Sequence, residues 1–215
     1  MARKGKGYVV DDVLRTNSFQ VTVNGVDHLG LYPRVSRINH ECRPNCVSRY
    51  SPSTLAMDVV AYRDIKEGEE LTFSYLPLNL PRETRQEMIR GWGFNCTCSL
   101  CSASAAEVET SDRQRLRIQD VLASFDDPVN HTHDKVHRAL DEVLELVGRE
   151  GMEAQIGDFY GIIARIYRDM GDLERAVEYA RMAVKEIRHY AGFDNERTVD
   201  AERFWDEVEG QFRRK

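Results

Sequence analysis

The chain has 215 residues, a hydrophobic fraction of 41% and a formal net charge of −6 at pH 7. Residues 1–101 carry 13 Lys and Arg against 11 Asp and Glu, whereas residues 102–215 carry 17 against 25. No apolar run approaches the roughly 20 residues that span a bilayer, and no concentrated basic face indicates nucleic-acid binding. We therefore expect neither a membrane nor a nucleic acid as a partner. The difference in charge between the two halves predicts two modules. The acidic second half either attracts a basic partner or is only the solvated side of its helices.

Short β-like segments separated by turn residues fill the first module. Residues 19–23 alternate apolar and polar side chains and end at Asn24-Gly25, a pair that favours a two-residue hairpin turn. A helix is expected from Pro81 to about Arg90, since proline favours the first helical turn. Further strands are expected at residues 46–50, 55–62 and 71–75.

Three cysteines follow that helix as C-x-C-x-x-C: Cys96, Cys98 and Cys101. A structural zinc takes four ligands, so the set needs one more. The run from Asn39 to Asn45 contains Cys42, the expected fourth ligand, with Cys46 as the alternative; a free cysteine is otherwise a small buried hydrophobe.

The total of 5 cysteines is odd, and the N-terminal MARKGKGYVV is basic without the long apolar core of a secretory signal. These features predict a reducing compartment, where clustered cysteines indicate metal binding rather than disulfides. We expect the cytoplasm, the nucleus or both.

The rest of the chain repeats apolar residues at helical spacing. Residues 160–183 place bulky, small, aromatic and turn residues where a tetratricopeptide repeat has them. Helical hairpins are expected, with breaks at Asp127-Pro128, Gly148–Gly151, Gly171-Asp172 and Gly192.

Three motifs together resemble the SET domain, the fold of protein-lysine methyltransferases. Residues 39–45, NHECRPN, match N-H-S-C-x-P-N with Glu41 in place of serine, and residues 68–75, GEELTFSY, match G-E-E-L-x-x-S-Y. Phe94 followed by the three cysteines matches the post-SET module. The helical tail is similar to the tetratricopeptide-like lobe of the SET and MYND group and of fungal-type SET proteins.

This resemblance implies an α+β fold class. Residues 1–80 would be the C-terminal part of a β-clip SET fold, 81–101 a helix with the post-SET zinc knuckle, 102–111 a linker and 112–215 a tetratricopeptide-like helical array. SET domains also have an N-terminal strand block with a G-x-G loop. Gly5-Lys6-Gly7 has that spacing but stands too close to Asn39 for the remaining strands, so we expect a decoy and a partial SET domain.

The resemblance also implies roles for single residues. Asn17, Asn39, His40 and Phe94 would contact the methyl donor S-adenosylmethionine, Phe94 by stacking on its adenine. Tyr75 would be the catalytic tyrosine and would contact the donor as well. The zinc would be structural, because four thiolates leave no open position, and would tie the post-SET loop over the donor pocket.

The implied function is an S-adenosylmethionine-dependent protein-lysine N-methyltransferase that acts on a histone or a non-histone protein. The alternative comes from another class of protein. It is a catalytically inactive, zinc-stapled module that binds a protein partner through its acidic helical lobe.

Overall fold

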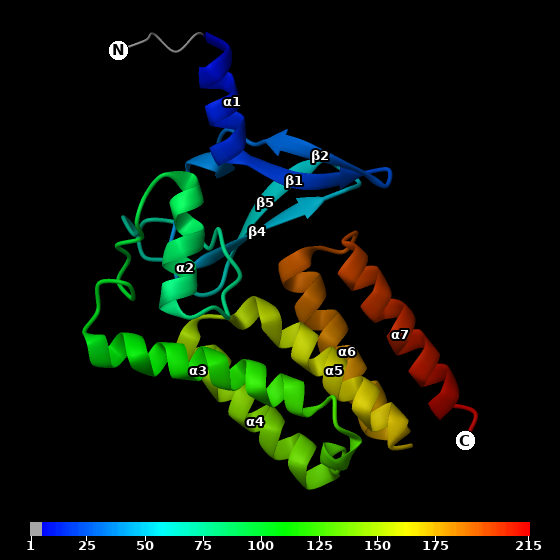
Figure 1. Cartoon of the computed structure of the whole chain (residues 1–215). Helices are drawn as coiled ribbons and strands as arrows, with labels where there is room; N and C mark the ends of the chain where they lie inside the picture. The colour runs from blue at the N-terminus through cyan, green and yellow to red at the C-terminus, as the bar shows by residue number, and fades with distance from the viewer. Residues whose placement is uncertain (1–5) are drawn as a thin grey trace.

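The computed structural model of the chain describes residues 6–215, with side chains from Val10 onward. Short strands lie on one side of the molecule and a helical C-terminal region on the other (Figure 1). The expected combination of small sheets with a helical region is confirmed. No helix of the described residues is both long and apolar enough to cross a bilayer.

Helix α1 (Lys6–Asn17) precedes the first strand, and the sequence pattern did not predict it. Arg15 in its last turn donates a hydrogen bond to the carbonyl oxygen of Gly91 at 3.1 Å, which ties α1 to a distant segment of the chain. Of the expected G-x-G decoy, Gly7 lies at the beginning of α1, and Gly5 lies outside the described residues.

The described strands form three two-stranded sheets. β1 (Ser18–Val23) and β2 (Val26–Leu31) are antiparallel, and the φ angles of 50° at Asn24 and 77° at Gly25 give the tight turn that the Asn-Gly pair predicts. The second sheet pairs β4 (Cys46–Ser51) with β5 (Ala56–Ala61), both as expected.

The third sheet is a short parallel pair that joins segments far apart in the sequence. β3 (Asn39–His40) aligns with β6 (Thr72–Phe73). The buried amide of Asn45 reinforces the pair: its Oδ1 accepts from the Thr72 N–H at 2.9 Å and its Nδ2 donates to the Glu70 carbonyl oxygen at 2.8 Å. The two sequence motifs at residues 39–45 and 68–75 therefore lie side by side.

Helix α2 (Arg82–Ile89) begins directly after Pro81, as predicted, and continues into the 3-10 turn η2 (Arg90–Trp92). Gly93 ends the turn with a φ of 88°, a left-handed conformation that glycine adopts without strain. The cysteine knuckle follows this turn.

Five α-helices form the C-terminal region: α3 (Ala105–Ser124), α4 (His133–Glu150), α5 (Ile156–Asp169), α6 (Leu173–Ala191) and α7 (Glu196–Phe212). The breaks between α3 and α7 fall where the sequence predicts them. α3 begins inside the expected linker at residues 102–111, because Ser104 and Glu107 form a capping box that satisfies the free N–H groups of its first turn.

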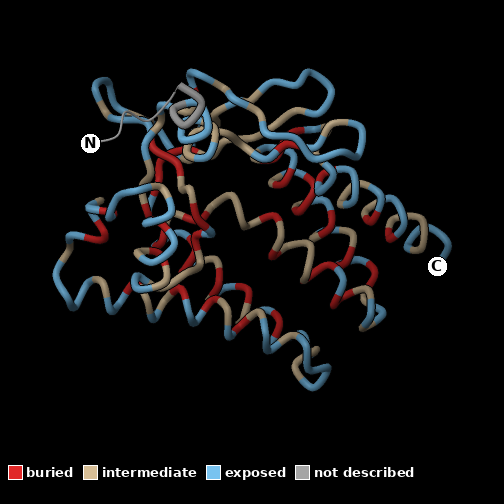
Figure 2. The backbone as a smooth tube through the Cα atoms, turned by 45° about the horizontal axis from the view of Figure 1, so that its top comes forward, coloured by how far each residue is buried: buried red, intermediate tan, exposed pale blue. Residues whose placement is uncertain are grey.

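The apolar core of the helical region lies between these helices, and buried residues line their inner faces in Figure 2. Apolar residues of α4, α5, α6 and α7 form one cluster, including Val136, Ile163, Ala180 and Val208. A second cluster joins α3 and α4 to Leu78 of the segment after β6. Helical spacing predicted this core, and the packing confirms it.

A buried ionic network attaches the helical region to the strands. Glu150, at the end of α4, is fully buried. Its carboxylate accepts hydrogen bonds from Arg43 at 2.8 Å, from Arg115 at 2.9 Å and from the Ser111 hydroxyl at 2.6 Å. Arg43 follows β3, whereas Ser111 and Arg115 lie on α3, so one carboxylate joins three elements.

Arg115 extends the same network to the main chain. Its fully buried guanidinium donates to the Cys42 carbonyl oxygen at 2.8 Å and to the carbonyl oxygen of Leu78. Burial lowers the pKa of Arg115, and the nearby Glu150 acts in the opposite direction. The arrangement holds the loop that carries Cys42 against α3.

Candidate functional site

Four cysteine sulfurs meet where the loop after β3 reaches the knuckle after η2. The Sγ atoms of Cys42, Cys96, Cys98 and Cys101 all lie within 4.8 Å of one another. Cys42 Sγ is 3.9 Å from Cys96 Sγ and 3.6 Å from Cys101 Sγ. Tetrahedral zinc with bonds of about 2.3 Å places its sulfur ligands about 3.8 Å apart, so these residues could hold such an ion.

Cys46, the alternative fourth ligand, is not part of this group. It lies in β4 with 2% of its surface exposed, and burial raises its pKa. A buried neutral thiol behaves as a small apolar side chain. The structure therefore groups Cys42, and not Cys46, with the other three cysteines.

The cysteine cluster stabilises negative charge on one of its sulfurs. Hydrogen bonds from Cys101 and Cys42 hold the pKa of Cys98 well below its usual range. Hydrogen bonds with Cys101 and Cys98, together with burial, raise the pKa of Cys42. Thiols this close cannot all ionise unless a cation joins them, so the geometry favours binding of a metal ion.

Polar contacts from other elements position the two segments that carry the cysteines. Gln86 of α2 makes two hydrogen bonds to the main chain of Cys96, at 2.8 and 3.2 Å. Glu41, which departs from the SET motif, accepts from the Ser99 hydroxyl at 2.7 Å and from Thr72 at 3.2 Å. The carboxylate thus connects the loop after β3 with the knuckle.

His40 connects Tyr75 to the cysteine cluster. The main-chain N–H of Tyr75 donates to His40 Nδ1 at 3.1 Å, so the ring hydrogen is on Nε2. Nε2 lies 3.4 Å from Cys42 Sγ and directs this hydrogen at the sulfur. Burial lowers the pKa of His40, which favours the neutral ring. The side chain therefore links the strand end to the possible metal site.

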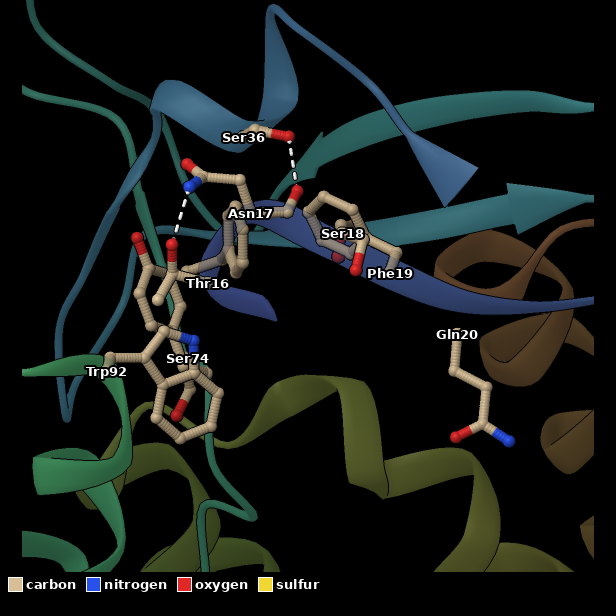
Figure 3. A pocket seen from close by; sticks show the side chains of 11 residues that line it. Thr16, Asn17, Ser18, Phe19, Gln20, Ser36, Ser74 and Trp92 are labelled. Carbon is tan, nitrogen blue, oxygen red and sulfur yellow. Dashed lines mark hydrogen bonds between the residues drawn. The ribbon is translucent and has the colours of Figure 1, made fainter. Parts of the chain in front are cut away.

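A cavity of about 260 Å³ lies beside this strand end. Figure 3 shows side chains reaching it from separate segments: Asn17 at the end of α1, Ser36 and Trp92. Asn17 Nδ2 donates to the Thr16 hydroxyl at 2.8 Å, and the main-chain carbonyl oxygen of Asn17 accepts from the Ser36 hydroxyl at 2.7 Å. The lining is completed by Thr16, Ser18, Phe19, Gln20, Ser48, Phe73, Ser74 and Tyr75.

Tyr75 stands in the middle of an aromatic group at this cavity. Its ring centroid is 5.4 Å from that of Phe73, 5.4 Å from that of His40 and 5.7 Å from that of Trp92. Its hydroxyl donates to the Ile38 carbonyl oxygen at 2.7 Å. Burial raises the pKa of this phenol, so the hydroxyl remains a hydrogen-bond donor at neutral pH.

Of the other expected site residues, one lines the cavity and two do not. Asn17 lines the cavity, whereas Asn39 directs its amide at Glu70 Oε1, 2.6 Å away. Phe94 keeps 40% of its surface exposed and does not line the cavity. Its large exposed ring is free to stack on a flat ligand, and that role stays a prediction.

Phe19, Phe73 and Trp92 line the cavity although sequence reasoning did not single them out. All three had a local signal, and Phe73 lies two residues before Tyr75 inside the motif at residues 68–75. Phe19 lies two residues after Asn17 in an N-S-F run, and Trp92 lies two residues before Phe94. Aromatic residues this close to expected site residues could have been included in the prediction.

Several known proteins have sequences similar to that of this chain. Residues 4–76 match the SET domain family. Histone-lysine N-methyltransferase set5 of Schizosaccharomyces pombe is 29% identical over 189 residues, which are 81% of this chain and 56% of that protein. N-lysine methyltransferase SMYD2 of Homo sapiens is 28% identical over 195 residues, 81% of this chain and 45% of that protein. The chain is therefore similar to SET-domain proteins, and residues 4–76 are its SET-like region.

A third protein matches a shorter part of the chain at higher sequence identity. Histone-lysine N-methyltransferase SMYD3 of Homo sapiens is 35% identical over 107 residues, which are 48% of this chain and 24% of that protein. The chain spans about half the length of the first two SET-domain relatives. The SET match contains both motifs that β3 and β6 bring together and ends directly after Tyr75.

Proposed function

We propose that the chain acts as an S-adenosylmethionine-dependent protein-lysine N-methyltransferase. The observation that carries the proposal is the aromatic cavity at Tyr75, beside the paired SET motifs. A lysine side chain is an aliphatic stem with a cationic end. Aromatic faces attract the cation, and a desolvated channel lowers the lysine pKa, which yields the neutral amine that methyl transfer requires.

The donor, when bound, supplies an electrophilic methyl group on a sulfonium ion. The residues of the chain then align the amine and exclude water. Phe19, Phe73 and Trp92 would hold the aliphatic stem, and the Tyr75 hydroxyl would orient the amine nitrogen. Asn17, Asn39, the His40 main chain and Phe94 remain the proposed donor contacts, with Phe94 stacking on adenine.

The proposed substrate is a lysine of a histone or of a non-histone protein, because the relatives are named histone-lysine and N-lysine methyltransferases. The proposed location is the cytoplasm or the nucleus. We further propose that the three small sheets belong to a β-clip and that the α5–α6 hairpin is a tetratricopeptide-like unit.

Zinc is the proposed ion of the cysteine cluster, with a structural role. Chelation is expected to lower the melting temperature by about 10 °C or more, because metal binding contributes several kcal/mol and roughly 2–4 °C corresponds to 1 kcal/mol in a chain of this size. The measurement is thermal unfolding before and after chelation, with zinc content determined in parallel.

Two cysteine variants make this test specific. Cys98→Ser removes a proposed ligand and is expected to abolish stoichiometric zinc. Cys46→Ala changes a buried thiol outside the cluster and should retain one zinc per chain. Loss of zinc from both variants, or from neither, would contradict the assigned ligand set.

The activity is tested by incubating the zinc-loaded chain with labelled S-adenosylmethionine and a panel of histone and non-histone proteins. Label on lysine is the expected result. Absence of both label and donor binding by calorimetry would reject the proposal for this chain. A folded, zinc-loaded chain that binds no donor would instead favour the alternative, an interaction module that uses its acidic helical region.

A further inference from the structure

Arg85 of α2 is a buried positive charge with few partners. Only 1% of its surface is exposed. Its Nη1 donates to the Leu80 carbonyl oxygen at 2.5 Å. Its Nε and Nη2 are buried and have no hydrogen-bond partner among the described residues. Burial of a guanidinium with unmatched N–H groups is strongly unfavourable unless negative charge faces it.

Asp112 supplies part of that negative charge. One of its carboxylate oxygens lies 3.6 Å from Arg85 Nη1, beyond hydrogen-bond distance. The same oxygen accepts the main-chain N–H of Arg82 at 2.8 Å. The Asp112 side chain is also 24% exposed, so its charge is shared and partly hydrated. It leaves the Nε and Nη2 groups of Arg85 unmatched.

The face of α2 that carries Arg85 is directed at the cysteine cluster. Ile89 is fully buried in the cluster that contains Cys42, Cys96 and Cys101. Arg85 precedes Ile89 by four residues and therefore lies on the same face of the helix. The next residue, Gln86, binds the main chain of Cys96.

We infer that Arg85 is a positioning residue of the metal site: its unmatched N–H groups face the cysteine thiolates, and its charge offsets the net charge of about −2 that four thiolates leave around a zinc ion. The inference rests on the zinc site proposed above. Groups outside the ligand shell orient ligands and raise metal affinity. Arg85 would have this role for Cys42 and its neighbours.

The test compares zinc affinity of the full chain and its variants by competition with a chromophoric chelator at fixed pH. Arg85→Met, which keeps much of the volume and removes the charge, is expected to weaken zinc binding about 10- to 100-fold. Arg203→Met is the control, since it also removes a positive charge but lies on α7 with 74% of its side chain exposed, and it should keep wild-type affinity.

Thermal unfolding of both metal states separates this role from simple packing. Without zinc, Arg85→Met should melt at the wild-type temperature or above it, because an unmatched buried charge is gone. With zinc, it should melt below the wild type. Equal zinc affinity of Arg85→Met and wild type, or a parallel loss of stability in both metal states, would overturn the inference.

An unfolded Arg85→Met variant and a wild-type chain without zinc are two further possible results. If Arg85→Met does not fold, the zinc affinity of Arg85→Lys is measured instead. Lysine keeps the positive charge but lacks the planar set of donors. A several-fold weaker zinc affinity is then expected, and wild-type affinity would overturn the inference. If the wild-type chain binds no zinc, the zinc site itself is rejected. If the wild type and the Arg85 variants bind zinc with equal affinity, only the proposed role of Arg85 is rejected.

Discussion

Replacing Tyr75 with phenylalanine is expected to reduce methyl transfer by about 100-fold or more, because the hydroxyl oxygen would no longer accept a hydrogen bond from the amine and align it for attack. The variant keeps the ring that packs between Phe73 and Trp92 and loses only the hydroxyl. Its hydrogen bond to the Ile38 carbonyl oxygen is worth about 1 kcal/mol, so the fold should persist. The measurement is the initial rate of label transfer, with thermal unfolding and zinc content alongside.

Tyr179→Phe is the matched control for this experiment. Tyr179 is a half-buried tyrosine of α6 whose ring stacks on Tyr167, away from the cavity. Its variant should transfer methyl groups at the wild-type rate. A Tyr75→Phe enzyme that remains as active as this control would remove Tyr75 from the mechanism.

Replacing Glu150 with glutamine is expected to destabilise the chain by about 3–5 kcal/mol, because the buried Arg115 then loses its charged partner. Total stabilities of single domains are about 5–15 kcal/mol, so this loss is large. Arg43 also loses its ion pair with Glu150. Urea denaturation of the zinc-loaded chain measures the effect.

Glu142→Gln on the same helix provides the comparison. Glu142 pairs with Arg117 at 2.7 Å, but both side chains are well exposed. Solvent screening limits such a pair to about 1 kcal/mol or less. If the two glutamine variants lost similar free energy, the buried network would not be what holds the helical region to the strands.

The parts of the fold that could be predicted depend on residues whose chemistry restricts the nearby backbone. Asn24-Gly25 favours a tight turn, and Pro81 favours the start of α2. Apolar spacing located most core positions of α4 to α6. In α7 it located Val208 but missed the buried Phe204 and included Phe212, which is exposed. The spacing of Cys96, Cys98 and Cys101 indicated a metal site before any geometry was known.

Other features depend on contacts between distant segments and have no local signal. The pairing of β3 with β6 joins short stretches about 30 residues apart, and the His40 side chain connects them further. The buried charges were missed for another reason. Arg85, Arg115 and Glu150 look like surface residues in the sequence, because charged side chains are almost never fully buried unless they are paired.

The network around Glu150 has a consequence for how the two halves of the chain can change over evolution. Arg115 is held on the strand side by the carbonyl oxygens of Cys42 and Leu78, and every amino acid provides a carbonyl oxygen. Among the described residues of that half, only Arg43 contributes a side chain to Glu150. Much of the sequence on either side of this contact can therefore diverge while the two halves remain joined, as long as the loops keep their shape.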